Sequence, residues 1–230
     1  MAGRDLCERM KALARRHLAA GTQPLEYEAQ VKYPGAPASL EAPGGKTVRR
    51  LLQACARDSL YRDWATSPQV AGRLHQLLGD QVELSQSHHN CIMTKNPAFS
   101  SATGWHQDIR YWLFERPELV SVWLALGTEH EENGCLWLVP GSHRMAFGPK
   151  QHDESLFLRK DHEQNRSILG KKIAAELDEG DVLFFHCRTL HAAGRNRTDL
   201  TKYAAVFTYH AADNRPLPGT RSASLPEVPL

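Results

Sequence analysis

The 230-residue sequence lacks the features of a membrane protein or a nucleic-acid-binding protein. Its apolar runs are short, as in Val182–Phe185, whereas a membrane-spanning helix needs about 20 such residues. The first residues contain no apolar core of the kind found in signal peptides. Lysine and arginine total 28 against 26 for aspartate and glutamate, so the net charge of +2 indicates neither a nucleic-acid groove nor binding to an anionic membrane. We therefore expect a cytoplasmic protein without membrane or nucleic-acid partners.

Cysteine is scarce, with five residues and no C-x-x-C pair. Cytoplasmic thiols are usually reduced, so we expect buried thiols and no structural disulfide. Histidine, by contrast, is abundant at 12 residues. Because neutral imidazole is the commonest metal ligand in proteins, this abundance motivates a search for a metal site.

The first part of the chain, residues 1–80, has the apolar spacing of helices. Apolar residues recur every three to four positions in Leu6–Leu13, Val48–Cys55 and Pro68–Leu78, which predicts three helices. The intervening segment Gln23–Lys46 is rich in proline and glycine and is predicted to be a loop. We expect these helices to flank one face of the domain.

From residue 81 onward the apolar period changes to two, and β-branched and aromatic residues become frequent. Strands are predicted at Val82–Lys95, Leu119–Leu126, Cys135–Val139, Lys172–Leu177, Val182–Cys187 and Tyr203–Ala211. Many short strands separated by turns favour an antiparallel sandwich or jelly roll over residues 81–212. The Pro- and Ser-rich tail, residues 213–230, is predicted to be irregular. The expected fold is a single domain, mainly β with flanking helices.

Three residues form a candidate metal site. In an extended chain His106 and Asp108 point to the same face, and His191 follows a strand much later in the sequence. Two histidines and one carboxylate on one side of an octahedral ion leave other positions open, which suits non-heme Fe(II) and oxygen chemistry. His143 and His186 compete with His191, but the first lies in a predicted turn and the second ends an apolar run typical of a core.

Three motifs occur in an order and spacing that resemble a known family. They are Trp105–Asp108, Glu132–His143 and Gly180–His191, the last followed by Gly194 and Asn196. From about Val82 to its end the sequence resembles the phytanoyl-CoA dioxygenase family of Fe(II)- and 2-oxoglutarate-dependent oxygenases. The chain begins close to its first predicted helix, where members of this family usually carry an additional strand.

This resemblance implies a double-stranded β-helix, the cupin-like jelly roll, with Fe(II) held by His106, Asp108 and His191. It also implies that 2-oxoglutarate and O2 are co-substrates, with ascorbate as a supporting reductant. The implied reaction is hydroxylation or another oxidation of a C–H bond in a small molecule, with release of succinate and CO2. Related halogenases lack the carboxylate ligand, so Asp108 indicates that halogenation is not the outcome.

The family usually binds the far carboxylate of 2-oxoglutarate with an arginine a short way after the distal histidine, and Lys202 occupies that position here. Alternation places Lys202, Ala204, Val206, Thr208 and His210 on one strand face. Lys202 therefore points inward if this face lines the barrel. Arg195 and Arg197 in the preceding turn are alternatives, and Lys95 matches a Lys-x-Pro element whose lysine often faces the co-substrate.

Substrate contacts are less well marked. The candidates are Trp105, Arg110, Tyr111, Trp112, His88 and His210. Arg110 shares a face with His106 and Asp108 if the strand persists, and only one of the adjacent His88 and His89 can face the interior of a regular strand. Residues 148–170 are either a lid or a plain surface insertion. The sequence indicates neither the substrate nor an oligomeric state.

Two other functions remain open. One is a cupin-type metal-dependent hydrolase or isomerase, in which Zn(II) or Mn(II) at the same three ligands activates water. The other is a non-catalytic jelly roll that binds a ligand. The three intact metal ligands argue against it, but the replacement of the family arginine by Lys202 keeps it open.

Overall fold

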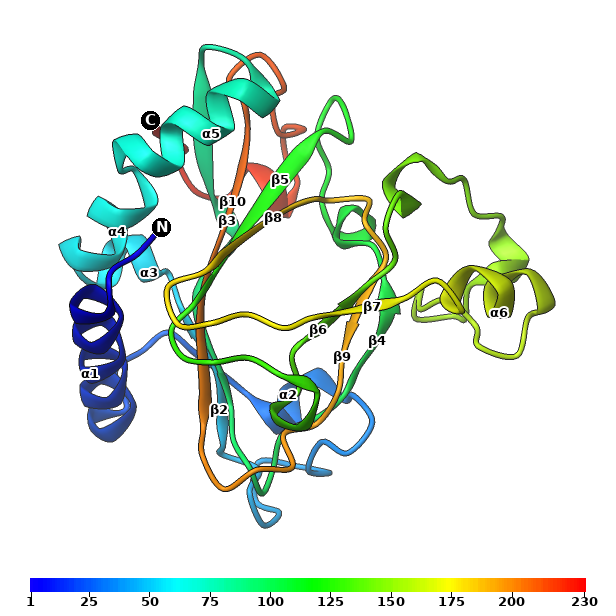
Figure 1. Cartoon of the computed structure of the whole chain (residues 1–230), viewed down its shortest axis with the longest axis horizontal. Helices are drawn as coiled ribbons and strands as arrows, with labels where there is room; N and C mark the ends of the chain where they lie inside the picture. The colour runs from blue at the N-terminus through cyan, green and yellow to red at the C-terminus, as the bar shows by residue number, and fades with distance from the viewer.

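Two antiparallel sheets face each other across the interior of the chain, in a computed structural model that describes residues 1–230 (Figure 1). The larger sheet has the strand order β1 (Leu25–Tyr27), β2 (Val48–Leu52), β3 (Val82–Lys95), β10 (Lys202–Ala211), β5 (Leu119–Ala125) and β8 (Val182–His186), with β11 (Val228–Pro229) also paired to β3. The smaller sheet has the order β4 (Thr103–His106), β9 (His191–Ala193), β6 (Leu136–Leu138) and β7 (Ile173–Ala175). The predicted jelly roll is confirmed.

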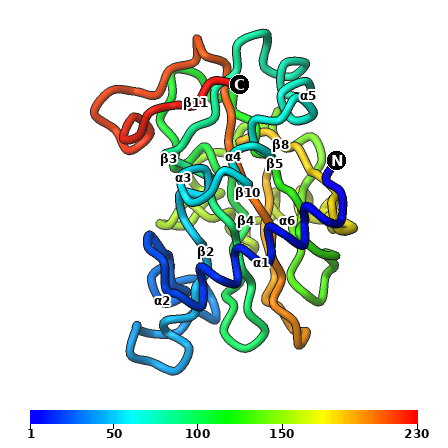
Figure 2. Tube along the Cα trace, turned by 90° about the vertical axis from the view of Figure 1, so that its left-hand side faces the viewer, coloured from blue at the N-terminus to red at the C-terminus, as the bar shows by residue number.

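Helices cover only the outer face of the larger sheet (Figures 1 and 2). They are α1 (Arg4–Ala20), α3 (Ala54–Arg57), α4 (Ser59–Ala65) and α5 (Pro68–Leu78). Two short helices lie elsewhere, α2 (Glu28–Val31) and α6 (Glu163–Leu169), and Figure 1 shows α6 on a protruding segment. None of the helices combines the length and apolar character that crossing a bilayer requires.

The largest apolar cluster lies between these helices and the larger sheet, not between the two sheets. It has 23 buried residues, including Met10 and Trp64 from the helices and Leu124 and Phe207 from the strands. The cluster between the sheets has only 8 buried residues, in which small side chains such as Ala204 and Val206 alternate with large ones such as Trp123 and Phe185. Packing of the helices on the outer face of the larger sheet therefore provides most of the apolar core, and a cavity remains between the two sheets.

Six strands form where the sequence predicts them, but the segment Val48–Cys55 does not form the predicted helix. Residues Val48–Leu52 form β2, whose Leu51 pairs with Ile92 of β3. A five-residue apolar pattern cannot by itself distinguish strand from helix, and pairing with the long strand β3 decides the outcome. The helical flank of residues 1–80 thus also contributes strands to the larger sheet.

Two segments predicted to be irregular contain regular structure. The predicted loop Gln23–Lys46 includes β1 and α2, since β1 extends the larger sheet beyond β2. The tail, residues 213–230, contains a 3₁₀ helix at Arg221–Ala223 and the strand β11. Val228 pairs with Leu84, so the tail satisfies backbone groups along β3 that would otherwise be exposed.

All five cysteines are buried and unpaired, as predicted. Burial raises the pKa of both Cys55 and Cys187 to about 12. These thiols therefore stay protonated at neutral pH and act as packing groups.

Replacing a side chain in the outer cluster tests where the stability of the fold lies. Leu124 is fully buried on β5. We expect Leu124→Ala to lower the free energy of unfolding by about 2–5 kcal/mol, because it leaves a cavity between the sheet and the helices. Urea denaturation measures this change. Leu200→Ala is the matched control, since Leu200 is 79% exposed, and an equal loss in both variants would contradict this location of the core.

Candidate metal centre

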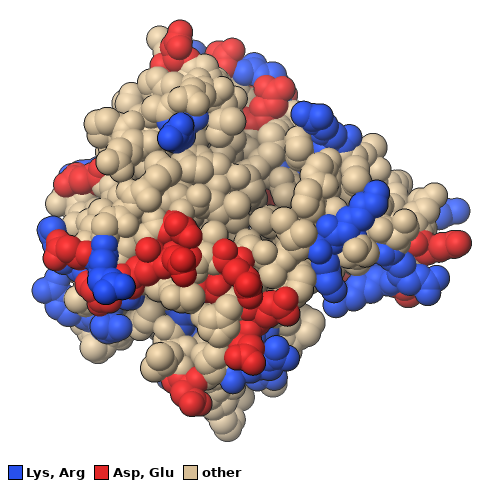
Figure 3. Space-filling model, viewed as in Figure 1, with Lys and Arg blue, Asp and Glu red and all other residues tan.

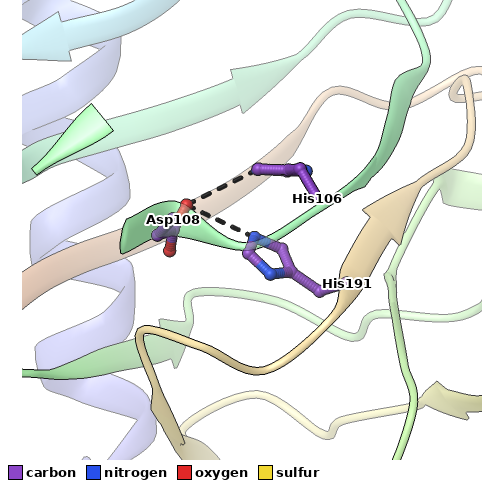
Figure 4. A group of neighbouring side chains, drawn as sticks. All are labelled: His106, Asp108 and His191. Carbon is purple, nitrogen blue, oxygen red and sulfur yellow. Dashed lines mark ion pairs between the residues drawn. The ribbon is translucent and has the colours of Figure 1, made fainter. Parts of the chain in front are cut away.

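The two candidate histidines face each other across paired strands of the smaller sheet. His106 at the end of β4 is the register partner of His191 at the start of β9, and their ring centroids are 4.2 Å apart. Asp108 follows at the start of a 3₁₀ helix, Asp108–Tyr111. Its Oδ1 lies 3.5 Å from Nε2 of each histidine (Figure 4). All three side chains are buried, and their ligand atoms lie within 4.8 Å of one another.

Backbone carbonyls fix the orientation of both imidazoles. Nδ1 of His106 lies 2.8 Å from the carbonyl oxygen of Gly104, and Nδ1 of His191 lies 2.9 Å from that of Thr189. A carbonyl only accepts hydrogen bonds, so each Nδ1 carries the proton and donates it. Each Nε2 therefore presents its lone pair to the centre, as in metal-binding histidines held by an outer hydrogen bond.

The protonation states of the metal-free protein favour a metal at His106 and Asp108. Burial alone would lower the pKa of His191, but the Asp108 carboxylate raises it, so a metal that binds there displaces a proton. Burial, together with the neighbouring His191, lowers the pKa of His106 to about 4, so its ring is neutral at pH 7. Burial alone would raise the pKa of Asp108, but the adjacent His191 and His89 hold it well below its usual value. Oδ2 of this ionised carboxylate is buried without a hydrogen-bond partner. A divalent cation would compensate this charge, and two nitrogens with one oxygen fit Fe(II).

The route by which Asp108 reaches the centre differs from the prediction. The strand does not persist beyond His106, because the chain turns into the 3₁₀ helix that begins at Asp108. The Ile109 amide donates to the Cys187 carbonyl oxygen at 3.1 Å, and this bond fixes the turn. The expected alternation of His106, Asp108 and Arg110 on one strand face is therefore wrong, although the first two side chains do converge.

The prediction that only one of His88 and His89 can face the interior is also wrong. On β3 the register with β10 shifts between Asn90, opposite Phe207, and Ser85, opposite Thr208. The resulting bulge lets both histidines line the same cavity. Nε2 of His89 lies 3.4 Å from Oδ1 of Asp108, a contact that the sequence reasoning missed.

A cavity of about 240 Å³ extends from the three candidate ligands between the two sheets. Of the predicted site residues outside the triad, it is lined by Lys95, Lys202, His88, Tyr111 and Trp112. Ala204 and Val206 line it beside Lys202, so the small face of β10 points inward as the alternation predicts.

The two lysines of the cavity are buried neighbours. Lys202 and Lys95 are register partners on β10 and β3. Lys202 Nζ donates to Glu129 Oε2 at 2.7 Å, whereas Lys95 Nζ donates to the carbonyl oxygen of Gly194. Burial, and then the charge of Lys202, lowers the pKa of Lys95 to about 7.

Other sequence candidates, Arg110 among them, lie outside the cavity lining. Arg195 is exposed and donates to the Ser100 carbonyl oxygen at 2.9 Å, and Arg197 is exposed. Trp105 packs in a separate apolar cluster. His210 is buried against Phe114, with Nε2 3.4 Å from Glu227 Oε2.

The rival ligands are likewise remote from the centre. The rings of His143 and His186 pack on each other with centroids 5.5 Å apart. Nδ1 of His186 accepts a bond from the Arg188 amide. These contacts account for the positions of both side chains, so neither histidine needs to be a metal ligand.

Three arginines of the cavity were missed by the sequence reasoning, namely Arg49 and Arg50 of β2 and Arg221 of the tail. The first two were hidden by the wrong helix prediction for this segment. The segment Val48–Leu52 does not alternate apolar and polar residues, so its local pattern contained no period of two that would indicate a strand. Nothing in the local sequence indicated that the tail folds back to the cavity.

Comparison with known proteins identifies the family. The family described as phytanoyl-CoA dioxygenase (PhyH) matches residues 4–204. The chain belongs to the phytanoyl-CoA dioxygenase family. Within it, the sequence is 30% identical over 195 residues to the ectoine dioxygenase of Halomonas elongata, covering 77% of this chain and 57% of the relative. It is 24% identical over 183 residues to the human peroxisomal phytanoyl-CoA dioxygenase, covering 75% and 52%. The chain thus spans little more than half the length of these relatives.

Solved structures of this family's fold resemble the chain throughout. EctD from S. alaskensis with 2-oxoglutarate and 5-hydroxyectoine has a TM-score of 0.74 at 20% identity, covering 93% of this chain and 70% of the other. The non-heme alpha ketoglutarate dependent epimerase SnoN from nogalamycin biosynthesis has a TM-score of 0.70 at 23% identity, covering 96% and 80%. These likenesses confirm the jelly roll.

Metal binding can be tested without any substrate. We expect Mn(II), used as an oxygen-stable substitute for Fe(II), to bind the protein in a one-to-one ratio by calorimetry, and His106→Ala or His191→Ala to abolish this binding because two donors are seldom sufficient. Bound metal also raises the Tm by mass action. His143→Ala is the matched control. Unchanged binding in His191→Ala would contradict the ligand set.

Proposed function

We propose that the protein is an Fe(II)- and 2-oxoglutarate-dependent dioxygenase that hydroxylates or otherwise oxidises a C–H bond of a small molecule. The observation that carries this proposal is the convergence of two Nε2 atoms and one carboxylate oxygen at the end of a buried cavity. Bound iron, 2-oxoglutarate and O2 would supply the oxidising chemistry, with succinate and CO2 as products and ascorbate as a supporting reductant.

In this proposal His106, Asp108 and His191 hold the iron on one side. The hydrogen bonds from Nδ1 to backbone carbonyl oxygens keep Nε2 of both rings directed at the iron position. His89 holds Asp108 in place through the 3.4 Å contact. The carboxylate of Asp108 occupies the position that related halogenases leave open, which supports hydroxylation or another oxidation.

The far carboxylate of 2-oxoglutarate is assigned to the pair Lys202 and Lys95. Glu129 neutralises only one of these two ammonium groups, and its other oxygen accepts from Trp123 Nε1 at 2.7 Å. An incoming carboxylate supplies the missing negative charge. The positions of Arg195 and Arg197 outside the cavity support the lysines over these alternatives.

The substrate is expected to contact the aromatic side chains that line the cavity, Tyr111 and Trp112. Trp112 is buried, with its ring centroid 5.0 Å from that of His88. His88 Nε2 in turn contacts Ser222 Oγ of the tail at 2.8 Å. This packed wall excludes water from the iron side of the cavity.

A cytoplasmic location is part of this proposal. It is supported by the five free, buried cysteines, since reduced thiols are typical of that compartment.

An assay of 2-oxoglutarate turnover tests the function. With Fe(II), ascorbate and air, we expect succinate release even without substrate. We expect Asp108→Ala to lower this turnover at least about a hundredfold, because it removes a metal ligand, and even changes in the groups that support metal ligands cost about 10–100-fold. Activity that requires neither O2 nor the oxoacid would instead identify the cupin-type hydrolase or isomerase. Absence of both activities, together with absent metal binding, would identify a ligand-binding jelly roll.

The pH dependence of 2-oxoglutarate use tests the lysine pair. The free protein has Lys95 with a pKa of about 7, and only its protonated form attracts a carboxylate. We expect the KM for 2-oxoglutarate to rise as the pH increases above 7, while Lys95→Gln has a high KM that no longer changes over this range. Lys202→Ala should raise the KM without loss of the metal. Wild-type pH dependence in Lys95→Gln would show that the anchor lies elsewhere.

A further inference from the structure

Arg110 is a half-buried residue whose guanidinium group has no ion-pair partner in the chain. Nε, Nη1 and Nη2 of its guanidinium are all inaccessible to solvent and lack a hydrogen-bond partner. Asp153 and Asp108 are close enough to act on its charge, but neither forms an ion pair with it. The two arginines of β2 that line the cavity differ in this respect, since Arg49 donates to Ser101 and Thr103 and Arg50 donates to Glu26.

Two aromatic rings hold this guanidinium beside the metal centre. Its Cζ lies 4.2 Å from the ring centroid of Tyr111 and 4.0 Å from that of Phe157. The same two rings stand edge-on to His106, with centroid distances of 6.5 Å and 5.9 Å. Cation–π contacts orient the guanidinium, but they supply no counter-charge.

Phe157 reaches this position from the segment of residues 148–170. Its ring packs against Gly104, where a Cβ atom would come within 2.9 Å of Cδ1. The glycine of β4 therefore admits the ring that covers Arg110. The segment is thus more than a surface insertion, because it supplies one of the two rings that contact the Arg110 guanidinium.

The charge of the surrounding surface favours the approach of anions. From Arg144 to Lys172 the chain carries seven lysines and arginines against four acidic residues. Lysine and arginine side chains gather on the protruding side of the molecule that holds α6 (Figure 3). Such a field attracts negatively charged ligands toward the nearby site.

We propose that Arg110 binds an anionic group of the substrate, a carboxylate or a phosphoryl group, and thereby fixes the substrate next to the iron. Guanidinium nitrogens that are buried without a partner are costly, and a carboxylate or phosphoryl group can accept hydrogen bonds from two of them at once. This inference rests on the proposed function and adds the substrate's charge to it. Lys95 and Lys202 remain the partners of the oxoacid.

Anion binding by the protein loaded with Mn(II) and 2-oxoglutarate tests this proposal without turnover. Methyl phosphate and acetate are titrated separately by calorimetry at constant ionic strength. We expect the wild type to bind at least one of these probes, and Arg110→Gln to weaken that binding about tenfold or more, the loss typical of a charge-assisted hydrogen bond. Arg110→Lys keeps the positive charge but lacks the paired donors of the guanidinium, so its affinity for the probes should lie between those of the wild type and Arg110→Gln.

The control variant is Arg116→Gln, because Arg116 is an exposed arginine already paired with Asp213 at 2.6 Å. It should bind the probes as the wild type does. Preference for methyl phosphate assigns a phosphoryl group to the substrate, and preference for acetate assigns a carboxylate. No binding by the wild type, or equal binding in Arg110→Gln, overturns the proposal. A tenfold loss of 2-oxoglutarate affinity in Arg110→Gln, with probe binding intact, also overturns it.

The outcomes for Arg110 and for the proposed function are distinguishable. Failure of the wild type to release succinate from 2-oxoglutarate contradicts the dioxygenase function alone. If a protein that releases succinate binds neither methyl phosphate nor acetate, this result contradicts only the role proposed for Arg110.

Discussion

The pairing of β4 with β9 in the register that sets His106 opposite His191 is the constraint on which the site depends. Directly paired residues on one face of a sheet have neighbouring side chains, so this register alone brings together two imidazoles that are distant in the sequence. A slip of one residue would turn one ring to the other face of the sheet. The outer cluster of helices and strands supports this register without filling the interior, because it packs on the far face of the larger sheet.

The interior of the jelly roll holds charges that the chain balances only in part. Asp108 has one buried oxygen without a partner, Lys95 has a carbonyl oxygen as its acceptor, and Arg110 has no hydrogen-bond partner. Each of these groups is costly to bury alone. A cation beside Asp108 and anions beside Lys95 and Arg110 would satisfy all three. We interpret these uncompensated charges as the complement of an iron ion, an oxoacid and an anionic substrate.

Much of the site could be predicted from the sequence, because short motifs carry the three candidate ligands and alternation on β10 turns Lys202 inward. The strands from residue 82 onward were predictable from their period of two. Other parts depend on tertiary pairing that no local pattern reports. β2 becomes a strand because it pairs with β3, the bulge in β3 turns both His88 and His89 inward, and the tail brings Arg221 to the cavity. The 3₁₀ helix after His106 is set by a bond to Cys187, distant in the sequence.

The central claim is that two imidazoles and one carboxylate bind a metal while leaving adjacent positions free. A crystal structure of the protein with Mn(II) and 2-oxoglutarate, with the metal located by its anomalous scattering, tests this claim most directly. We predict one ion bound by Nε2 of His106, Nε2 of His191 and a carboxylate oxygen of Asp108, with the oxoacid in the remaining positions. An ion enclosed entirely by protein atoms, with His89 as a further ligand and no oxoacid, would contradict it.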